Sequence, residues 1–318
     1  MSYIYDNCND AWPQTVRLIA RRGVPEDSRN GKVLAYPVPI TFSYLRPTER
    51  VLFCEKRNIN PYLHFFEPLW ILAGRRDVEF LADIVSRFRE YSDNGNVFNA
   101  AYGYRLRFPD DQITQAIQRL KRNPNDRQVV LQIRKPEDMW YTGKDTACNL
   151  CAALSIRDGA LSIHVFNRSN DVVWGGPAGG ANFPQFSTLL EYLAGHIGVK
   201  VGMYHHTTNN MHAYVDTPDW QRVIDTPYID NPYPQIGVRP YPLFEPGVDP
   251  DMFDEDLYNF FASGKTIHSR SLFFQEVVAP MWESFRRYKA GERNAYVQVA
   301  AQDWDIRLLN WLGNKNRV

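Results

Sequence analysis

Residues 145–171 read DTACNLCAALSIRDGALSIHVFNRSND, and this stretch decides the fold class. The segments LCAALSIRDG and ALSIHVFNRS are predicted strands, and Asp158-Gly159 between them is a favoured pair for a tight hairpin turn. If the two strands pair, Arg168 lies beside Cys148. The stretch therefore predicts a β-hairpin that brings a cysteine and an arginine together at one end.

The flanking segments mix strands and helices without regular alternation. Further predicted strands are RQVVLQIRK, from Arg127, and residues 199–207. Apolar spacing and Pro or Gly boundaries predict helices over residues 11–22, 61–74, 78–89, 182–197, 272–288 and 299–311. Residues 228–254 are rich in Pro, Asp and Gly and are predicted to form a surface excursion. We expect an α+β fold in a single catalytic domain spanning residues 1–318.

Composition and charge narrow the class of protein. The 318 residues carry 36 Lys and Arg against 36 Asp and Glu, so no basic excess predicts a nucleic-acid partner. No apolar run is long enough to span a membrane, and the N-terminus does not resemble a signal peptide. Four cysteines are too few for a disulfide scaffold of this size. We expect a reduced, cytoplasmic protein that binds small anions through a few local arginines.

Cys148 is the candidate nucleophile. A neighbouring Arg168 would favour the thiolate form and could also bind phosphate. Spacing alone favours the interpretation of Cys148 and Cys151 as small hydrophobic residues of a strand, the commoner role of a cysteine. No second ligand pair supports a zinc site, so no metal is expected, and the context for a redox dithiol is missing.

An ordered set of motifs resembles the thymidylate synthase family. Its Pro-Cys-His strand corresponds to residues 147–149, and its Gln-Arg-Ser-x-Asp turn to residues 167–171. Its other elements, namely Glu-Leu-Leu-Trp, Tyr-Gly-x-x, Ser-Arg-Arg, Gly-x-Pro and Asp-x-His-x-Tyr, correspond to residues 67–70, 102–105, 126–128, 175–177 and 210–214. The resemblance covers roughly residues 20 to 220. It implies a thymidylate synthase-like mixed β-sheet flanked by helices, with one sheet face forming a homodimer interface.

The resemblance also implies catalytic roles at a pyrimidine base. Cys148 would add to C6 of the ring, because sulfur attacks conjugated carbon and leaves again. Tyr102 would assist removal of the C5 proton. Glu67, an expensive carboxylate within an apolar helix, would organise water and move protons at the base. Asp171 would contact the folate ring of 5,10-methylenetetrahydrofolate, the implied cofactor.

The same resemblance implies a phosphate and sugar site. Arg29, Arg168 and Ser169 would hold phosphate from one subunit, and Arg127 would reach in from a second subunit. The family's second arginine at that point is Gln128 here. His212 and Tyr214 alternate along an extended segment, so both can face one side and bind a sugar hydroxyl.

Three departures from the family pattern bear on the substrate and the product. Gly179 takes the position of the amide that reads the uracil edge, for which Asn182 or a water could substitute. Asn149 follows the nucleophile in place of His, and Phe88 stands where the family has an indole near the one-carbon acceptor. A smaller and wetter wall favours capture of the exocyclic methylene by water, which yields a hydroxymethyl group in place of a methyl group.

Taken together, the motifs resemble the nucleotide hydroxymethylase branch, and within it the cytidylate 5-hydroxymethylases of mildiomycin-type antibiotic biosynthesis. This implies 5-hydroxymethylation of CMP, with Ala178 and Lys135 as candidates for accommodating the ribose 2′-hydroxyl. The alternatives are a dCMP or dUMP hydroxymethylase, a divergent thymidylate synthase, or an inactive homologue that binds nucleotide or its own messenger as a regulator. The retained Cys, Glu and Tyr and the zero net charge argue against the last.

Overall fold

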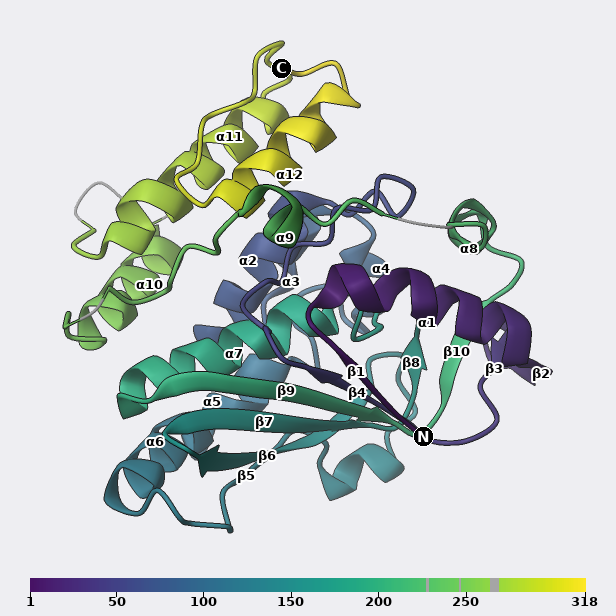
Figure 1. The fold of residues 1–318 in the computed structure, drawn as a ribbon, viewed down its shortest axis with the longest axis horizontal. Coiled ribbons are helices and arrows are strands. Elements are labelled where there is room, and N and C mark those ends of the chain that lie inside the picture. Colours follow the sequence, from purple (N-terminus) through teal and green to yellow (C-terminus); the bar gives the residue numbers. More distant parts are fainter. Residues whose placement is uncertain (227–228, 246, 264–268) are drawn as a thin grey trace.

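The computed structural model describes residues 1–226, 229–245, 247–263 and 269–318. Within these ranges a mixed six-stranded sheet has the order β1-β4-β9-β7-β6-β5 (Figure 1). Its strands are β1 (Ser2–Tyr5), β4 (Ile40–Tyr44), β9 (Lys200–Thr208), β7 (Ala160–Asn167), β6 (Asn149–Arg157) and β5 (Val130–Gln132). A smaller sheet joins β2 (Val24–Ser28), β3 (Gly31–Ala35), β10 (Met211–Tyr214) and β8 (Asn170–Asp171). The predicted α+β class is confirmed.

One face of the large sheet is covered by helices. α7 (Asn182–Ile197) packs on β7 and β9, and α2 (Pro61–Leu72) packs on α7. Every residue of α2 is buried, as its nearly continuous apolar sequence predicts. α5 (Tyr102–Arg107) lies so close to α2 that a Cβ on Gly103 would stand 2.0 Å from the carbonyl oxygen of Ile71. Glycine at 103 is therefore what lets α5 approach the helix that carries Glu67.

The predicted hairpin forms between β6 and β7. Asp158 and Gly159 adopt φ values of 51° and 71°, the left-handed geometry that a tight hairpin turn requires. The register pairs Asn149 with Asn167, and a bulge follows Asn149. This pairing brings the segments around residues 148 and 168 together.

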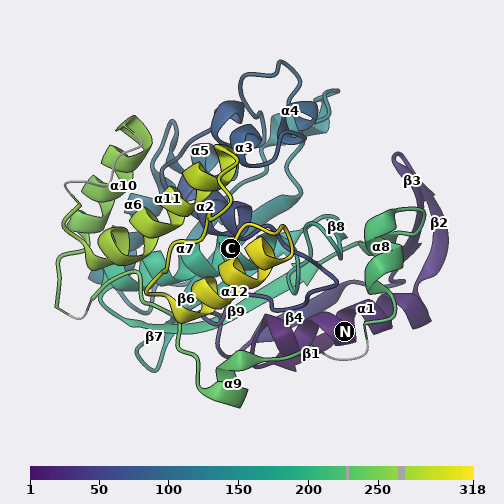
Figure 2. The ribbon, with the colours of Figure 1, turned by 90° about the horizontal axis from the view of Figure 1, so that it is seen from above.

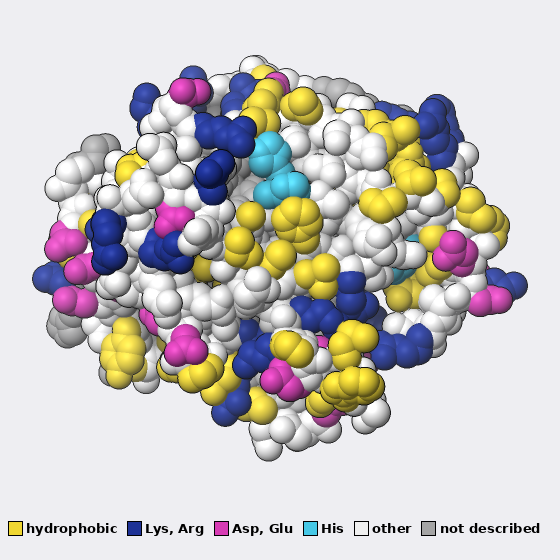
Figure 3. All heavy atoms as spheres, turned by 90° about the horizontal axis from the view of Figure 1, so that it is seen from below, with side chains coloured by type: hydrophobic (Ala, Val, Ile, Leu, Met, Phe, Trp, Pro, Cys, Tyr) yellow, Lys and Arg dark blue, Asp and Glu magenta, His cyan; other side chains and the backbone are white. Residues whose placement is uncertain are grey.

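The opposite face of the large sheet carries half-exposed side chains. His164 stacks on Phe166 with ring centroids 4.2 Å apart and lies 5.7 Å from the ring of His205. Histidine and hydrophobic side chains gather on this side of the molecule (Figure 3). This is the face that the sequence predicts as a dimer interface, and that role stays a prediction.

Two predicted helices differ from the structure at their ends. α1 (Cys8–Arg22) begins three residues before the predicted start, because the Asn7 side chain accepts hydrogen bonds from the first-turn N–H groups. The helix predicted over residues 78–89 is broken into α3 (Val78–Ile84) and α4 (Phe88–Tyr91). Val85 between them is extended, with φ −137° and ψ 104°. α6 (Gln112–Arg122) and the short η1 (Pro136–Met139) complete the first half.

The C-terminal part is helical. Its elements are α8 (Pro218–Val223), α9 (Pro232–Ile236), α10 (Asp251–Ser263), η2 (Phe274–Val278), α11 (Ala279–Lys289) and α12 (Gln302–Gly313). α8 and the β2–β3 hairpin lie at one end of the molecule, away from α10 and α11 (Figure 2). None of the described helices has the length and apolar character needed to cross a membrane.

The predicted excursion over residues 228–254 is more tightly packed than a surface loop. Its first residue, 228, and residue 246 lie outside the described part of the chain. Tyr233 and Leu243 are buried, and the Tyr233 hydroxyl donates to Asp303 at 2.9 Å and accepts from the Val51 N–H at 3.1 Å. The segment therefore ties α12 to the body of the fold.

Candidate active site

Cys148 and Arg168 meet at the end of the β6–β7 hairpin. Nη2 of Arg168 donates to Sγ of Cys148 at 3.4 Å, and Nε of Arg168 donates to the Ala147 carbonyl at 3.1 Å. The guanidinium group is therefore fixed against the sulfur. Cys148 is half-buried and thus within reach of a ligand. The juxtaposition predicted from strand pairing is confirmed.

Tyr102 on α5 lies near both Cys148 and Glu67, which is carried by α2. Burial raises the pKa of Tyr102, and the nearby Cys148 raises it further, while a hydrogen bond with Asn149 lowers it. Burial also raises the pKa of Glu67 to about 7, against a smaller opposing effect of its hydrogen bond with Gln185. Oε2 of Glu67 has no hydrogen-bond partner among the described residues. A carboxyl group that titrates near neutral pH can both hold and release a proton.

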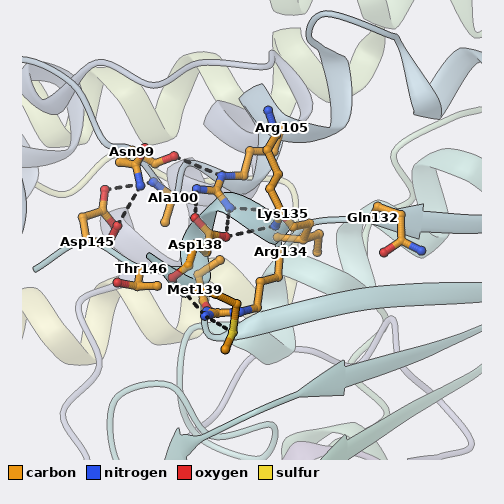
Figure 4. A network of polar contacts seen from close by, with 12 residues as sticks. Asn99, Ala100, Arg105, Gln132, Arg134, Lys135, Asp138, Met139, Asp145 and Thr146 are labelled. Atoms are coloured by element: carbon orange, nitrogen blue, oxygen red, sulfur yellow. Dashed lines mark hydrogen bonds and ion pairs between the residues drawn. The ribbon is translucent and has the colours of Figure 1, made fainter. Parts of the chain in front are cut away.

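A buried ion pair fixes the helix of Tyr102 to the segment that precedes Cys148. Arg105 on α5 donates to both carboxylate oxygens of Asp138, at 2.5 and 2.8 Å (Figure 4). Asp145 accepts a hydrogen bond from the Ala100 N–H at 3.0 Å, just before α5 begins. These bonds set the position of the phenol relative to the thiol, although neither group takes part in them.

An open pocket of about 330 Å³ lies beside Arg168. It is lined by the turn of the β2–β3 hairpin, the turn after β7, and β10, through residues 26–30, Val33, Arg168, Ser169, Asn210, His212 and Tyr214. The rings of His212 and Tyr214 are 5.1 Å apart, so both face the same side, as predicted.

The charge of this pocket is mixed. Arg29 and Arg168 supply two guanidinium groups and Ser169 a hydroxyl, which together suit a phosphate. Glu26 and Asp27 also line the pocket, and Arg29 is exposed at the tip of the hairpin. The sequence reasoning named the basic and polar members but missed the two carboxylates.

Four buried asparagines lie beneath the nucleophile. Asn167 donates to Asn149 at 2.9 Å, Asn149 to Asn182 at 3.1 Å, and Asn182 to Asn170 at 3.3 Å. Asn182 is the first residue of α7, so its amide is held between the helix and the hairpin. Buried amides in strands that are otherwise apolar were the signal in the sequence, but only the pairing of β6 with β7 shows that they form a chain.

Gly179, which takes the family's base-reading position in the sequence, lies against α1. A Cβ at this position would lie 2.0 Å from the indole ring of Trp12, so residue 179 faces α1. Ala178 next to it is buried. Asn182, the substitute considered from the sequence, is instead in contact with Asn149, the neighbour of Cys148.

Asp171 is half-buried and lies near a cation, Arg57, that the sequence did not indicate. Burial raises the pKa of Asp171 to about 6, although the Val173 N–H and Arg57 both act to lower it. Arg57 is itself buried and donates to the Val173 carbonyl at 2.9 Å.

Phe88 lies in a separate apolar cluster, with its ring 6.1 Å from that of Phe98.

Two predicted ligand-binding residues are exposed and lie outside the pocket lining. Arg127 stands just before β5. Lys135 begins η1, where its backbone N–H donates to Asp138 at 3.0 Å (Figure 4). The predicted roles of both, across a subunit interface and at the ribose, stay predictions.

Comparison with known proteins agrees with this geometry. The thymidylate synthase family model matches residues 10–236. A deoxyuridylate hydroxymethyltransferase of Pseudomonas phage M6 is 38% identical over 329 aligned residues, covering 96% of this chain and 92% of the relative. A deoxyuridylate hydroxymethyltransferase of Bacillus phage SP01 is 40% identical over 213 residues, covering 61% of this chain and 55% of the relative. The chain belongs to the thymidylate synthase family.

Proposed function

We propose that this chain, a one-carbon transferase of the thymidylate synthase family, adds a hydroxymethyl group to C5 of CMP. Hydroxymethylation of a pyrimidine nucleotide is supported by the names of both relatives. The observation that carries the assignment is the contact between Arg168 and Cys148 at the edge of a pocket suited to phosphate. The choice of CMP over other pyrimidine nucleotides is the more specific part of the proposal.

We assign one residue to each step of the proposed chemistry. The sulfur of Cys148 bonds to C6, which moves electron density to C5 so that this carbon can act as a nucleophile. C5 would then bond to the one-carbon unit of 5,10-methylenetetrahydrofolate. Tyr102 would assist departure of the C5 proton as the bond between that carbon and the folate nitrogen breaks, which leaves a methylene on C5. Glu67, poised near neutral pH, would position the water that adds to this exocyclic methylene. The sulfur then leaves C6, which restores the aromatic ring.

The one-carbon unit would come from 5,10-methylenetetrahydrofolate. Because water supplies the oxygen and no hydride is consumed, the folate product is tetrahydrofolate. Among the described residues, Oε2 of Glu67 and Nε1 of Trp70 are buried without a partner, which fits a site that a polar ligand completes. Asp171 and Phe88 are the proposed folate contacts.

The substrate contacts follow the two parts of the pocket. Arg29, Arg168 and Ser169 would hold the phosphate, and His212 and Tyr214 the sugar. Asn182 would read the base, while Ala178 and Lys135 would accommodate the ribose. In a homodimer formed through the half-exposed sheet face, Arg127 of a partner subunit would complete the phosphate site.

The second candidate is dUMP hydroxymethylation. Both relatives are named deoxyuridylate hydroxymethyltransferases, and the first aligns with 96% of this chain. The chemistry at Cys148, Tyr102 and Glu67 is the same for either base.

Product mass separates the candidates. The protein is incubated with 5,10-methylenetetrahydrofolate and CMP, dCMP, UMP or dUMP in turn. We expect CMP to gain one CH₂O unit without formation of dihydrofolate. A gain of one CH₂O on dUMP alone would transfer the assignment to the second candidate. A gain of one CH₂ with dihydrofolate would identify a thymidylate synthase reaction and overturn the hydroxymethylase proposal.

A further inference from the structure

The chain of buried amides has a defined direction, and its first end is fixed by the backbone. Oδ1 of Asn167 accepts a hydrogen bond from the N–H of Ser169 at 2.8 Å. A backbone N–H can only donate, so the amide oxygen of Asn167 must face Ser169 and its NH₂ must face Asn149. Each following amide then accepts with its oxygen and donates with its nitrogen: Asn149 to Asn182, and Asn182 to Asn170.

The second end is fixed independently. Nδ2 of Asn170 lies 3.4 Å from Nε2 of His206, and Nδ1 of His206 lies 2.7 Å from the Tyr204 hydroxyl. Burial lowers the pKa of His206 to about 3, so the ring is neutral. The Tyr204 hydroxyl in turn donates to the carbonyl of Asn182 at 3.4 Å, and a carbonyl can only accept. His206 must therefore donate from Nδ1 and accept at Nε2, which is the direction that the Ser169 end imposes.

This direction determines which amide atom of Asn182 faces each edge of the base. The oxygen of Asn182 lies on the side of Asn149, next to Cys148 and bonded to Tyr102, and the nitrogen lies on the side of Asn170. Around the pyrimidine ring, C6 at the sulfur is followed by C5 at the phenol, then by C4 and N3. With Asn182 reading the base, as proposed above, its amide oxygen would face the substituent on C4 and its amide N–H would face N3.

Only one of the two bases matches this arrangement. Cytosine offers an amino donor on C4 and an acceptor at N3, whereas uracil offers an acceptor on C4 and a donor at N3. Uracil would place oxygen against oxygen and N–H against N–H. We propose that the directed chain from Ser169 through Asn182 to Tyr204 sets this protein to read cytosine. Asn167, His206 and Tyr204 act as positioning residues, and the inference rests on the proposed attack of Cys148.

The substitution Asn167→Asp tests the direction. A carboxylate at 167 accepts from both Ser169 and Asn149, so Asn149 turns over and every following amide turns with it. His206 moves its proton to Nε2, and Tyr204 donates to Nδ1. Asn182 then presents N–H to the C4 substituent and oxygen to N3, the pattern for uracil. We expect the ratio of kcat/KM for CMP over UMP to fall by roughly 100-fold at pH 8.5, in line with the discrimination of a bidentate base contact.

Asn167→Ala is the matched control, because it removes the anchor without supplying an acceptor. This variant should convert both CMP and UMP more slowly. Its ratio of kcat/KM for CMP over UMP should change by less than about tenfold, the size of effect expected from the loss of one hydrogen bond. If the wild-type protein converts no pyrimidine nucleotide, the proposed function fails. If the wild-type protein converts UMP in preference to CMP, hydroxymethylation stands, but CMP as substrate and the inference are both overturned. If the wild-type protein prefers CMP and a folded Asn167→Asp protein keeps the wild-type ratio, the proposed function stands and only the inference is overturned.

A spectroscopic measurement decides the case if Asn167→Asp does not fold. Nitrogen NMR of the wild-type protein reports which ring nitrogen of each of the seven histidines is protonated. Loss of one signal set in His206→Gln assigns His206. Protonation at Nδ1 supports the proposed direction, and protonation at Nε2 overturns it.

Discussion

The two ends of the proposed nucleotide site differ in how far their side chains are exposed to solvent. At the proposed phosphate end, Arg29 is exposed in the turn that follows β2, whose five residues, Val24–Ser28, are all exposed. At the base end, Asn149 is 0% exposed and Asn182 is 5% exposed. A phosphate can keep part of its hydration and requires mainly charge, so an exposed site serves it. Recognition of a base requires polar groups in a fixed orientation. Burial makes a wrong orientation costly, because a buried polar group without a hydrogen-bond partner destabilises the protein by about 1–3 kcal/mol.

The largest effect is expected where the two ends meet. Cys148→Ala should lower exchange of the C5 proton of the nucleotide by at least about 10,000-fold, because removal of a nucleophile abolishes the covalent step. Nucleotide affinity should change by less than about threefold, since the phosphate and base contacts remain. Proton exchange is followed by NMR and affinity by calorimetry.

Cys151→Ala is the matched control for that prediction. Cys151 is half-buried on β6, three residues after Cys148, and the Cys151→Ala variant should retain activity. Retained proton exchange in Cys148→Ala would remove Cys148 from the mechanism.

An intermediate effect is expected from the buried carboxyl group. Glu67 has a folded-state pKa of about 7 against an ordinary value of 4.5. The contribution of Glu67 to the free energy of unfolding is therefore fully present below about pH 4.5. It is lost as the pH rises through 7, because folding then buries a charged carboxylate. Glu67→Gln lacks this penalty, so its stability relative to the wild type should rise by up to about 3 kcal/mol between pH 4.5 and pH 8.

Denaturant unfolding at the two pH values measures that difference. The control variant Glu90→Gln, at an exposed position on α4, should show no change between the two pH values in its stability relative to the wild type. The same gap between Glu67→Gln and wild type at both pH values would mean that the Glu67 carboxyl is not held neutral by burial.

The smallest effect is expected at the exposed end. Arg29→Ala should weaken nucleotide binding by roughly 5- to 10-fold, because an exposed cation contributes about 1 kcal/mol to an anion contact. The loss should shrink at high salt and should be absent for the corresponding nucleoside. Titration calorimetry with both ligands tests this, with Arg21→Ala on α1 as an exposed arginine outside the pocket. An equal loss for nucleoside and nucleotide would place Arg29 away from the phosphate.

Local patterns predicted the elements that depend on local interactions. The hairpin at Asp158-Gly159 and the helix over residues 182–197 form as the sequence indicates, because turn geometry and apolar spacing act within a few residues. The helix over 78–89 was wrong as a single element, since Val85 is extended. In the segment over 228–254, the turn residues gave no sign that Tyr233 packs against Asp303.

The amino-acid sequence by itself determined the α+β class, the pairing of Cys148 with Arg168 and the ordered motifs of the thymidylate synthase family. These follow from strand periodicity and from spacing along the chain. Only the tertiary structure decided that Gly179 faces Trp12, that Asn182 meets Asn149, and that His206 joins the same chain of hydrogen bonds. The reason is physical: the direction of a buried amide depends on all of its partners at once, and those partners come from strands and a helix far apart in the sequence.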